Sequence, residues 1–150
     1  MKKHDADVIV VGGGLGGLTL TALLAAAGVT TICLDREAPP ATLSAAFDGR
    51  TTAISYGSRQ VLERAGIWDA LAPVSCAIET IQISDGDSPV LLEFASREAG
   101  GKTFGWIAEN LALRRALYDR VAALPAARHI APATVAGFAV DDTGARALLA

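Results

Sequence analysis

The chain has 150 residues, of which 51% are hydrophobic and 19% are charged, and its formal net charge is -3 at pH 7. These values exclude a disordered chain, and without a basic run the chain has no electrostatic footprint for nucleic acid. A length of this order predicts one domain that buries about two thirds of the surface of its unfolded chain.

Few side chains are available for metal or nucleophilic chemistry. The two cysteines, Cys33 in an expected strand and Cys76 in an expected loop, form no CxxC or other metal-ligand spacing. They predict reduced thiols in a cytoplasmic protein. The two histidines, His4 and His129, are too few for a histidine metal site or a Ser-His-Asp triad. Metal catalysis is therefore not expected.

The first unit along the chain is a strand, a glycine turn, a helix and a second strand. An apolar β-branched run, 8–11, predicts the first strand, and the motif G-x-G-x-x-G follows it at Gly12, Gly14 and Gly17. In such a turn the first glycine permits the bend, the second lets a pyrophosphate approach, and the third allows the helix to pack on the strand. The free N–H groups and the positive end of the helix dipole then bind the pyrophosphate.

An acidic residue closes this unit. Asp35 follows the second strand, where a carboxylate can accept hydrogen bonds from the hydroxyls of an adenosine ribose. The expected cofactor contacts of the unit are Gly12, Gly14, Leu15, Gly16, Gly17 and Asp35. A signal peptide or membrane helix over 8–34 is the alternative, but each glycine between 12 and 17 would cost a spanning helix about 1 kcal/mol. The sequence therefore favours a dinucleotide site.

The segment 36–56 shows neither helical nor strand periodicity and predicts a long functional loop. Arg50 lies in this segment beside a glycine. Its planar guanidinium can bind phosphate oxygens in a bidentate manner, or it can be a solvated surface side chain. The residues alone leave these two readings open.

Short helical segments are expected next. Ser58 is a suitable N-cap for a helix that Gly66 ends. The residues 67–71 predict a further helical turn that stops before Pro73. Trp68 is expected in the core.

Two strands, 78–84 and 90–94, are predicted after these helices, and the turn residues 85–89 join them as a hairpin. A hairpin interrupts the alternation of strands and helices, so these strands are expected in a separate sheet. We interpret this sheet as the start of a substrate-side subdomain.

A helix over 111–123 follows a glycine-containing loop. Apolar residues at Leu113, Leu117 and Val121 recur at helical spacing and predict one buried stripe. Asn110 is either the N-cap of this helix or a hydrogen-bonding partner of the cofactor. Arg114 is either a solvated residue or a phosphate ligand.

The C-terminal part returns to strand character. The residues 128–131 predict a third parallel strand beside the strand that ends before Asp35, with His129 as a strand-end residue without chemistry. The segments 133–140 and 145–150 predict a β-meander around a turn.

Three segments resemble the FAD-dependent aromatic-ring hydroxylases: GGGLGG, DGRTTAISYGSRQVLERAGIWDAL and GWIAENLALRRALYDRV. The chain is most similar to the ubiquinone-biosynthesis branch, the 2-polyprenylphenol and 2-polyprenyl-6-methoxyphenol hydroxylases, along essentially its whole length. The resemblance implies an α/β, Rossmann-like FAD-binding domain with a parallel sheet and a β-meander. It also implies that Arg50 lies against the FAD, that Arg36 lines the adenosine side, and that Asn110 lies near the flavin. Arg114 completes the candidate cofactor contacts.

The expected organisation has three ranges. Residues 1–75 form the FAD-binding unit with its cofactor loop and helices, 76–108 the inserted hairpin, and 109–150 the returning helix and strands. Asp35 stands where the family usually has a glutamate, and its shorter arm still reaches a ribose hydroxyl.

Family members are much longer and carry a second FAD motif with a Gly-Asp pair, whereas no G-D-A-A-H-like segment occurs here. We therefore expect a truncated, N-terminal portion that is inactive alone and incomplete at its C-terminus. The strand 8–11 is then left as an exposed apolar edge.

The resemblance implies a flavoprotein monooxygenase. NAD(P)H reduces the FAD, and dioxygen supplies the oxygen atom that is transferred to a small phenolic substrate, while the protein orients the ring and excludes water. A polyprenylated phenol implies peripheral contact with the inner membrane or with a biosynthetic complex. The alternatives are a non-catalytic dinucleotide-binding fragment and an NAD-binding half of another oxidoreductase.

Overall fold

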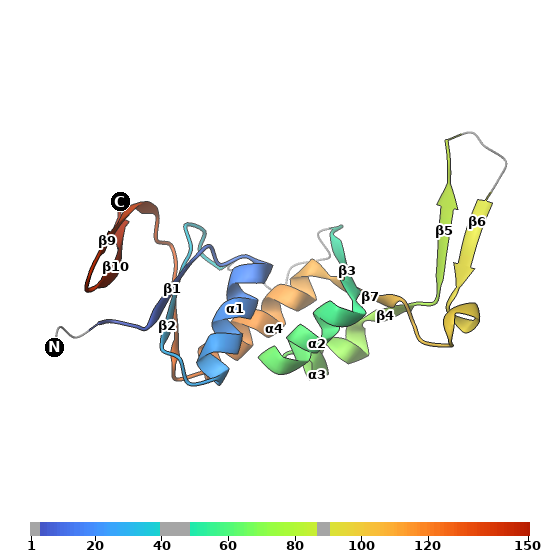
Figure 1. The fold of residues 1–150 in the computed structure, drawn as a ribbon, viewed down its shortest axis with the longest axis horizontal. Helices are drawn as coiled ribbons and strands as arrows, with labels where there is room; N and C mark the ends of the chain where they lie inside the picture. The colour runs from blue at the N-terminus through green and yellow to red at the C-terminus, as the bar shows by residue number, and fades with distance from the viewer. Residues whose placement is uncertain (1–3, 40–48, 87–90) are drawn as a thin grey trace.

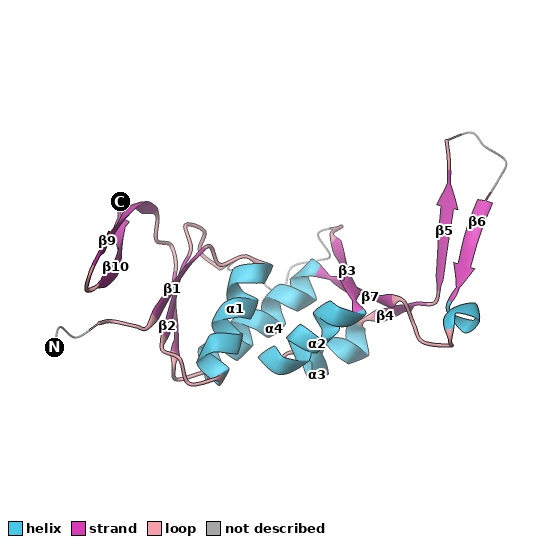
Figure 2. Ribbon diagram, viewed as in Figure 1, coloured by secondary structure: helices cyan, strands magenta, loops and turns pink. Residues whose placement is uncertain are grey.

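The computed structural model describes residues 4–39, 49–86 and 91–150. The molecule is elongated, with a parallel sheet at one end and a projecting hairpin at the other (Figure 1). Figure 2, which is coloured by secondary structure, shows the helices between the strands of the two ends. The expected turn residues 87–89 and the start of the second hairpin strand at 90 lie outside the described residues.

The N-terminal unit is confirmed. The strands of its sheet and the helix that joins the first two are β1 Val8–Val11, α1 Leu15–Ala26, β2 Thr31–Leu34 and β8 Ala127–Ile130. All three strands are parallel in the order β1-β2-β8, and Cys33 pairs with both Val10 and His129. Among the described strands β1 is an edge, with Ile9 37% and Val11 63% exposed.

Alternation along the strands sends successive side chains to opposite faces of this sheet. Val10 and Cys33 point to the helical face, where they join the buried core with Leu18 and Ala22 of α1. Cys33 is a buried free thiol, and burial raises the pKa of its thiol above the ordinary value. The core continues through α4, Asn110–Ala123, whose buried stripe is the predicted one: Leu113, Leu117 and Val121.

A second sheet, separate from the hairpin, was not predicted. Its strands are β3 Thr51–Ser55, β7 Gly105–Glu109 and β4 Cys76–Ile78, antiparallel in the order β3-β7-β4. The expectation of an unstructured segment up to residue 56 was wrong, because β3 lies within it and buries Ile54. Cys76 begins β4 and is exposed, so its expected place in a loop was also wrong.

The short helices α2 Tyr56–Ala65 and α3 Trp68–Leu71 follow β3. The N-cap of α2 is Ser55 and not Ser58, because β3 runs directly into the helix and the Ser55 hydroxyl accepts the N–H of Ser58 at 3.1 Å. Gly66 ends α2 in the left-handed conformation, as predicted.

The predicted helical turn is confirmed as α3, which ends at Leu71, before Pro73. A 3-10 turn, Ala72–Val74, follows α3 directly. Pro73 lies in its first positions, where the missing N–H of proline breaks no hydrogen bond within the helix. Trp68 is buried, which confirms its predicted place in the core.

The hairpin is confirmed as a sheet of its own, formed by β5 Thr80–Ser84 and β6 Leu91–Ala95. The short 3-10 turn Ser96–Ala99 follows it. Ile81 faces Phe94 and Ile83 faces Leu92 across the two strands, and all of them are exposed. This hairpin projects away from the helices (Figure 1).

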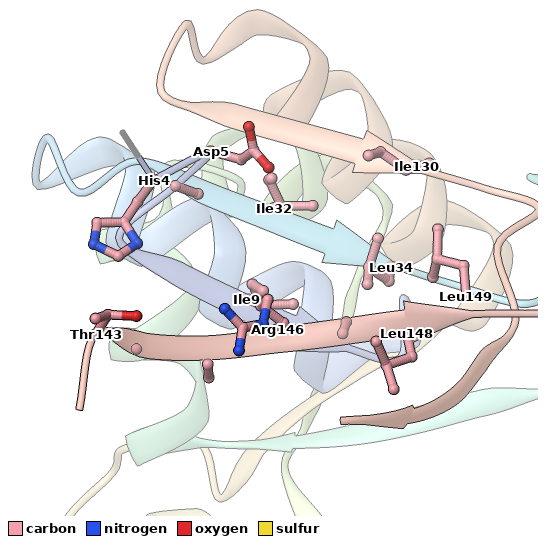
Figure 3. Close-up of a pocket in the computed structure, with 14 residues that line it drawn as sticks. His4, Asp5, Ile9, Ile32, Leu34, Ile130, Thr143, Arg146, Leu148 and Leu149 are labelled. Carbon is pink, nitrogen blue, oxygen red and sulfur yellow. The ribbon is translucent and has the colours of Figure 1, made fainter. Parts of the chain in front are cut away.

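The predicted C-terminal strands are β9 Val135–Asp141 and β10 Gly144–Leu149, an antiparallel pair. They cover the face of the parallel sheet that is opposite to the helices. Ile9, Ile32 and Leu34 of the sheet line a cavity of about 430 Å³ together with residues of β10. Figure 3 shows Leu149 of β10 on the side of Leu34. Because Ile32 and Leu34 point away from the helical face, this cavity is separate from the helical core.

The turn between β9 and β10 gives a test of pH dependence. The Asp141 carboxylate accepts hydrogen bonds from Thr143 and pairs with Arg146, and these contacts lower the pKa of Asp141 to about 2. Because folding lowers this pKa, the ionised carboxylate stabilises the fold at pH values above its unfolded pKa of 3.8. This stabilisation is lost as the pH falls towards 2. We expect Asp141→Asn to lower the melting temperature at pH 6 but not at pH 2, with the exposed Asp85→Asn as control.

Candidate functional site

The glycine turn has the geometry that each motif glycine requires. Gly12 has a φ of +103°, which allows the chain to turn sharply out of β1. A Cβ on Gly17 would lie 1.8 Å from the carbonyl oxygen of Gly12, so only glycine fits where α1 passes the turn. A Cβ on Gly14 would meet no atom of the described chain within 4 Å. The open space is therefore at Gly14, where a pyrophosphate is expected.

The N-terminus of α1 faces this open space. Gly14 is its N-cap, and among the described residues no side chain caps the helix by a hydrogen bond. The first turn of α1 contains no acidic residue. The first N–H groups of a helix have no partner within the helix, and the helix dipole adds a partial positive charge there. An anionic group of a ligand is thus well accommodated at this end.

A cavity of about 190 Å³ adjoins the turn. Residues of three segments line it: Gly12, Gly13, Gly14, Asp35, Arg36, Glu37, Ala38, Arg114 and Tyr118. The backbone of Asp35 is fixed, because its N–H donates to the carbonyl of Ile130 at 3.1 Å and its carbonyl accepts the N–H of Ala133. Its side-chain Oδ1 accepts the N–H of Glu37 at 3.1 Å. The cavity thus combines the glycine turn with an anchored carboxylate.

One face of α4 completes the site. Asn110, Arg114 and Tyr118 are spaced four residues apart, which places them on the same side of the helix. Arg114 and Tyr118 line the cavity beside the glycine turn, whereas Asn110 is at the start of the helix. Burial raises the pKa of the Tyr118 phenol, so it is a neutral hydrogen-bonding group at neutral pH. This face extends the site along α4 for about 12 Å.

The reading of Asn110 as an N-cap was wrong. Glu109 has that position, and Asn110 is the first residue of α4. The Asn110 N–H donates to the carbonyl of Arg50 at 3.1 Å, and its side-chain Oδ1 accepts the hydroxyl of Thr52 at 2.5 Å. Arg50 is exposed just before β3. The structure therefore brings Arg50 and Asn110 together, although they are distant in the sequence.

Two further predicted residues, Leu15 and Gly16, line a second cavity of about 420 Å³ with a mostly apolar wall. This cavity lies between α1, α2, α4 and β3, and Thr52 also lines it. The Thr52 hydroxyl donates to Asn110, and the Asn110 N–H donates to the carbonyl of Arg50. The second cavity therefore borders both the start of α1 and the Arg50 region. Five predicted residues therefore line the first cavity (Gly12, Gly14, Asp35, Arg36 and Arg114), Leu15 and Gly16 line the second, and Gly17, Arg50 and Asn110 are in neither lining.

Sequence reasoning missed Gly13 and Tyr118, which line the first cavity, and His129, which lies beside both of them. Gly13 lies at a position of the motif that accepts any residue. Here a Cβ on it would lie 2.5 Å from Asp35 Oδ2 and 2.9 Å from His129 Nε2. The rings of Tyr118 and His129 are 5.5 Å apart. Tyr118 could have been found from the sequence, because it lies one helical turn after Arg114 and therefore on the same side of the helix.

The family follows from a comparison with known domains. The model for the FAD binding domain matches residues 5–149, which is nearly the whole chain. The chain belongs to this family. An open Gly14, an uncapped helix N-terminus and a nearby carboxylate are what the pyrophosphate and adenosine of FAD require, so the residues present fit the cofactor.

Individual curated relatives are hydroxylases by name. The chain is 42% identical to the ubiquinone hydroxylase UbiL of Rhodospirillum rubrum over 96% of its own length and 33% of that protein. It is 27% identical to the 3-demethoxyubiquinol 3-hydroxylase of Escherichia coli, over 83% of the chain and 32% of that protein. The chain therefore spans about a third of the length of these curated relatives.

Solved structures share the fold. The p-nitrophenol 4-monooxygenase PnpA of Pseudomonas putida superimposes with a TM-score of 0.76 over 99% of this chain and 40% of that chain, at 19% identity. The likeness confirms the Rossmann-like FAD-binding fold. No helix in the described part of the chain is long and apolar enough to cross a membrane.

Proposed function

We propose that this chain is the FAD-binding part of a flavoprotein monooxygenase that hydroxylates a phenolic ring in ubiquinone biosynthesis. The observation that carries the proposal is the 42% identity to a ubiquinone hydroxylase over 96% of the chain. The bound FAD would accept electrons from NAD(P)H and use dioxygen as the source of the transferred oxygen. A polyprenylated phenol as substrate, with peripheral contact to the inner membrane or a biosynthetic complex, is part of the same proposal.

Different sets of the candidate residues would hold different parts of FAD. Gly12, Gly14 and Gly17 would shape the turn for the pyrophosphate, with Leu15 and Gly16 contributing N–H groups of the first turn of α1. The adenosine side would contact Asp35, Arg36 and Arg114 around the 190 Å³ cavity. Arg50 and Asn110 would lie on the flavin side, because they meet at the far end of the α4 face. The division into 1–75, 76–108 and 109–150 belongs to the same proposal.

Titration of the purified chain with FAD and NAD tests the proposal. We expect the chain to bind FAD stoichiometrically, with the yellow absorbance of a flavin retained after gel filtration, and to bind NAD more weakly. A colourless chain that takes up no FAD would favour a non-catalytic fragment. Preferential NAD binding would favour an NAD-dependent oxidoreductase. Hydroxylation itself is tested in the complete protein, by NAD(P)H- and oxygen-dependent turnover of a polyprenylated phenol.

The ribose contact of Asp35 predicts a specific loss. Replacing the carboxylate by Asp35→Asn removes a charged hydrogen-bond acceptor, which contributes about 1.5–3 kcal/mol. We expect FAD affinity to fall about tenfold to a hundredfold, measured by quenching of flavin fluorescence. The matched control is Asp85→Asn, an exposed acid that follows β5. Equal FAD affinity of Asp35→Asn and the control would contradict the assigned role.

A further inference from the structure

A polar atom is buried without a partner behind the glycine turn. His129 Nε2 is shielded from solvent and has no hydrogen bond to the described residues. A buried donor or acceptor that forms no hydrogen bond is unfavourable and is uncommon in folded proteins. His129 is in β8, next to Cys33 of β2, and it points to the helical face of the sheet, where its ring meets Tyr118. The pairing of β8 with β2 and the neighbouring Tyr118 ring therefore fix His129 Nε2 at a defined position beside the candidate cofactor site.

The neighbouring groups show what Nε2 faces. A Cβ built on Gly13 would lie 2.5 Å from Asp35 Oδ2 and 2.9 Å from His129 Nε2, so both atoms border the same small space. Asp35 Oδ1 already accepts the N–H of Glu37. The second carboxylate oxygen, Oδ2, is thus the one on the side of the imidazole. A carboxylate oxygen has two acceptor positions and can serve the imidazole and a ribose hydroxyl together.

Tyr118 limits the orientation of the imidazole. The two rings are tilted by 36° with their centroids 5.5 Å apart, and Tyr118 lies on α4 with one side in the cavity. The imidazole packs near the Tyr118 ring, and a Cβ on Gly13 would lie 2.9 Å from its Nε2. Asp35 Oδ2 and His129 Nε2 lie 2.5 Å and 2.9 Å from the same point beside Gly13, so a rotation of the Asp35 side chain can bring Oδ2 to Nε2.

We propose that His129 is a positioning residue for Asp35, whose Oδ2 accepts a hydrogen bond from His129 Nε2 when the adenosine ribose of FAD binds. The bond holds the carboxylate towards the ribose hydroxyls. Gly13 is required because any side chain there would separate the two groups. The inference rests on the proposed binding of FAD through Asp35, and it explains both the unpartnered nitrogen and the glycine at a motif position that is free elsewhere.

Two variants distinguish positioning from packing. His129→Phe keeps a ring against Tyr118 but removes the nitrogen, whereas His129→Gln keeps an N–H donor but removes the ring. The readout is the preference of the full chain for ADP over 2′,3′-dideoxy-ADP, each measured by displacement of FAD. This ratio isolates the ribose hydroxyls, because the two probes share the base and the phosphates. Arg128→Gln, at the exposed neighbouring position of β8, is the control.

We expect His129→Phe to lower this preference about tenfold, the effect of one hydrogen bond to a charged group, and His129→Gln to keep most of it. In an Asp35→Asn background, His129→Phe should change the preference no further. The proposal is overturned if the glutamine variant loses as much preference as the phenylalanine variant, or more. It is also overturned if His129→Phe has the same effect with and without Asp35. A wild-type chain that binds neither FAD nor ADP would instead refute the proposed function, and this inference with it.

Discussion

Gly14→Val is expected to abolish the binding of FAD while the chain stays folded. The valine side chain would point into the open space at the start of α1, where we propose that the pyrophosphate approaches the backbone. Gly14 has a φ of -71° and a ψ of -176°, an extended conformation that valine adopts without strain. We expect affinity for FAD to fall by about a hundredfold or more, measured by flavin fluorescence.

The fold of this variant can be checked independently. Valine is a weak N-cap, which costs about 1 kcal/mol of stability, so the circular dichroism of the helices should be nearly unchanged at 25 °C. Gly28→Val is not a suitable control because Gly28 has a φ of +85°. Gly57→Ala in α2 is suitable, since its φ is ordinary and its Cβ would meet only the Ser55 hydroxyl, 4.0 Å away. Wild-type FAD affinity in Gly14→Val would refute the pyrophosphate role.

Gly17→Ala is expected to act on a different property: it should lower the stability of the fold, whether or not FAD is bound. The added methyl group would lie 1.8 Å from the backbone oxygen of Gly12, so α1 has to move away from β1. Forcing an extra methyl group into a packed contact costs about 1–3 kcal/mol, and more where backbone must shift. Native domains have only about 5–15 kcal/mol in total. Urea unfolding followed by circular dichroism measures the difference.

The matched comparison for this variant is Gly16→Ala, one residue earlier on the same helix. A Cβ on Gly16 meets no atom of the described chain within 4 Å, and alanine favours a helix over glycine by about 1 kcal/mol. Gly16→Ala should therefore be at least as stable as the wild-type chain. If both alanine variants unfold at the same urea concentration, the close approach of α1 to the turn has no energetic importance.

Local patterns were sufficient to predict the N-terminal unit. The glycine spacing, the β-branched run and the acidic residue after β2 each agree with one simple arrangement, and the structure confirms it. The strand β3 was missed because its inward positions include Thr52, which made an alternating segment look polar throughout. Its stability as a strand depends on pairing with β7, a partner more than fifty residues away. Pairing between strands so far apart in the chain produces no pattern within the sequence of β3 itself.

The candidate site shows the same limit more clearly. The motif glycines and Asp35 were found because they follow one another along the chain. Tyr118 and His129 reach the site only through α4 and β8, so their proximity to Gly13 depends on the packing of those elements. The N-cap reading of Asn110 was wrong by one residue, because α4 begins at Asn110 itself, directly after β7 ends at Glu109.

The uninterrupted helix α4 restricts how this site can change in evolution. It carries Asn110, Arg114 and Tyr118 on one face, from the Arg50 region to the 190 Å³ cavity. Insertion or deletion of one residue within α4 would rotate the following part by about 100°. Such a change after Arg114 would carry Tyr118 away from the cavity and leave Asn110 in place. Homologous sequences that bind FAD in this way should therefore vary in the composition of α4 but keep its length.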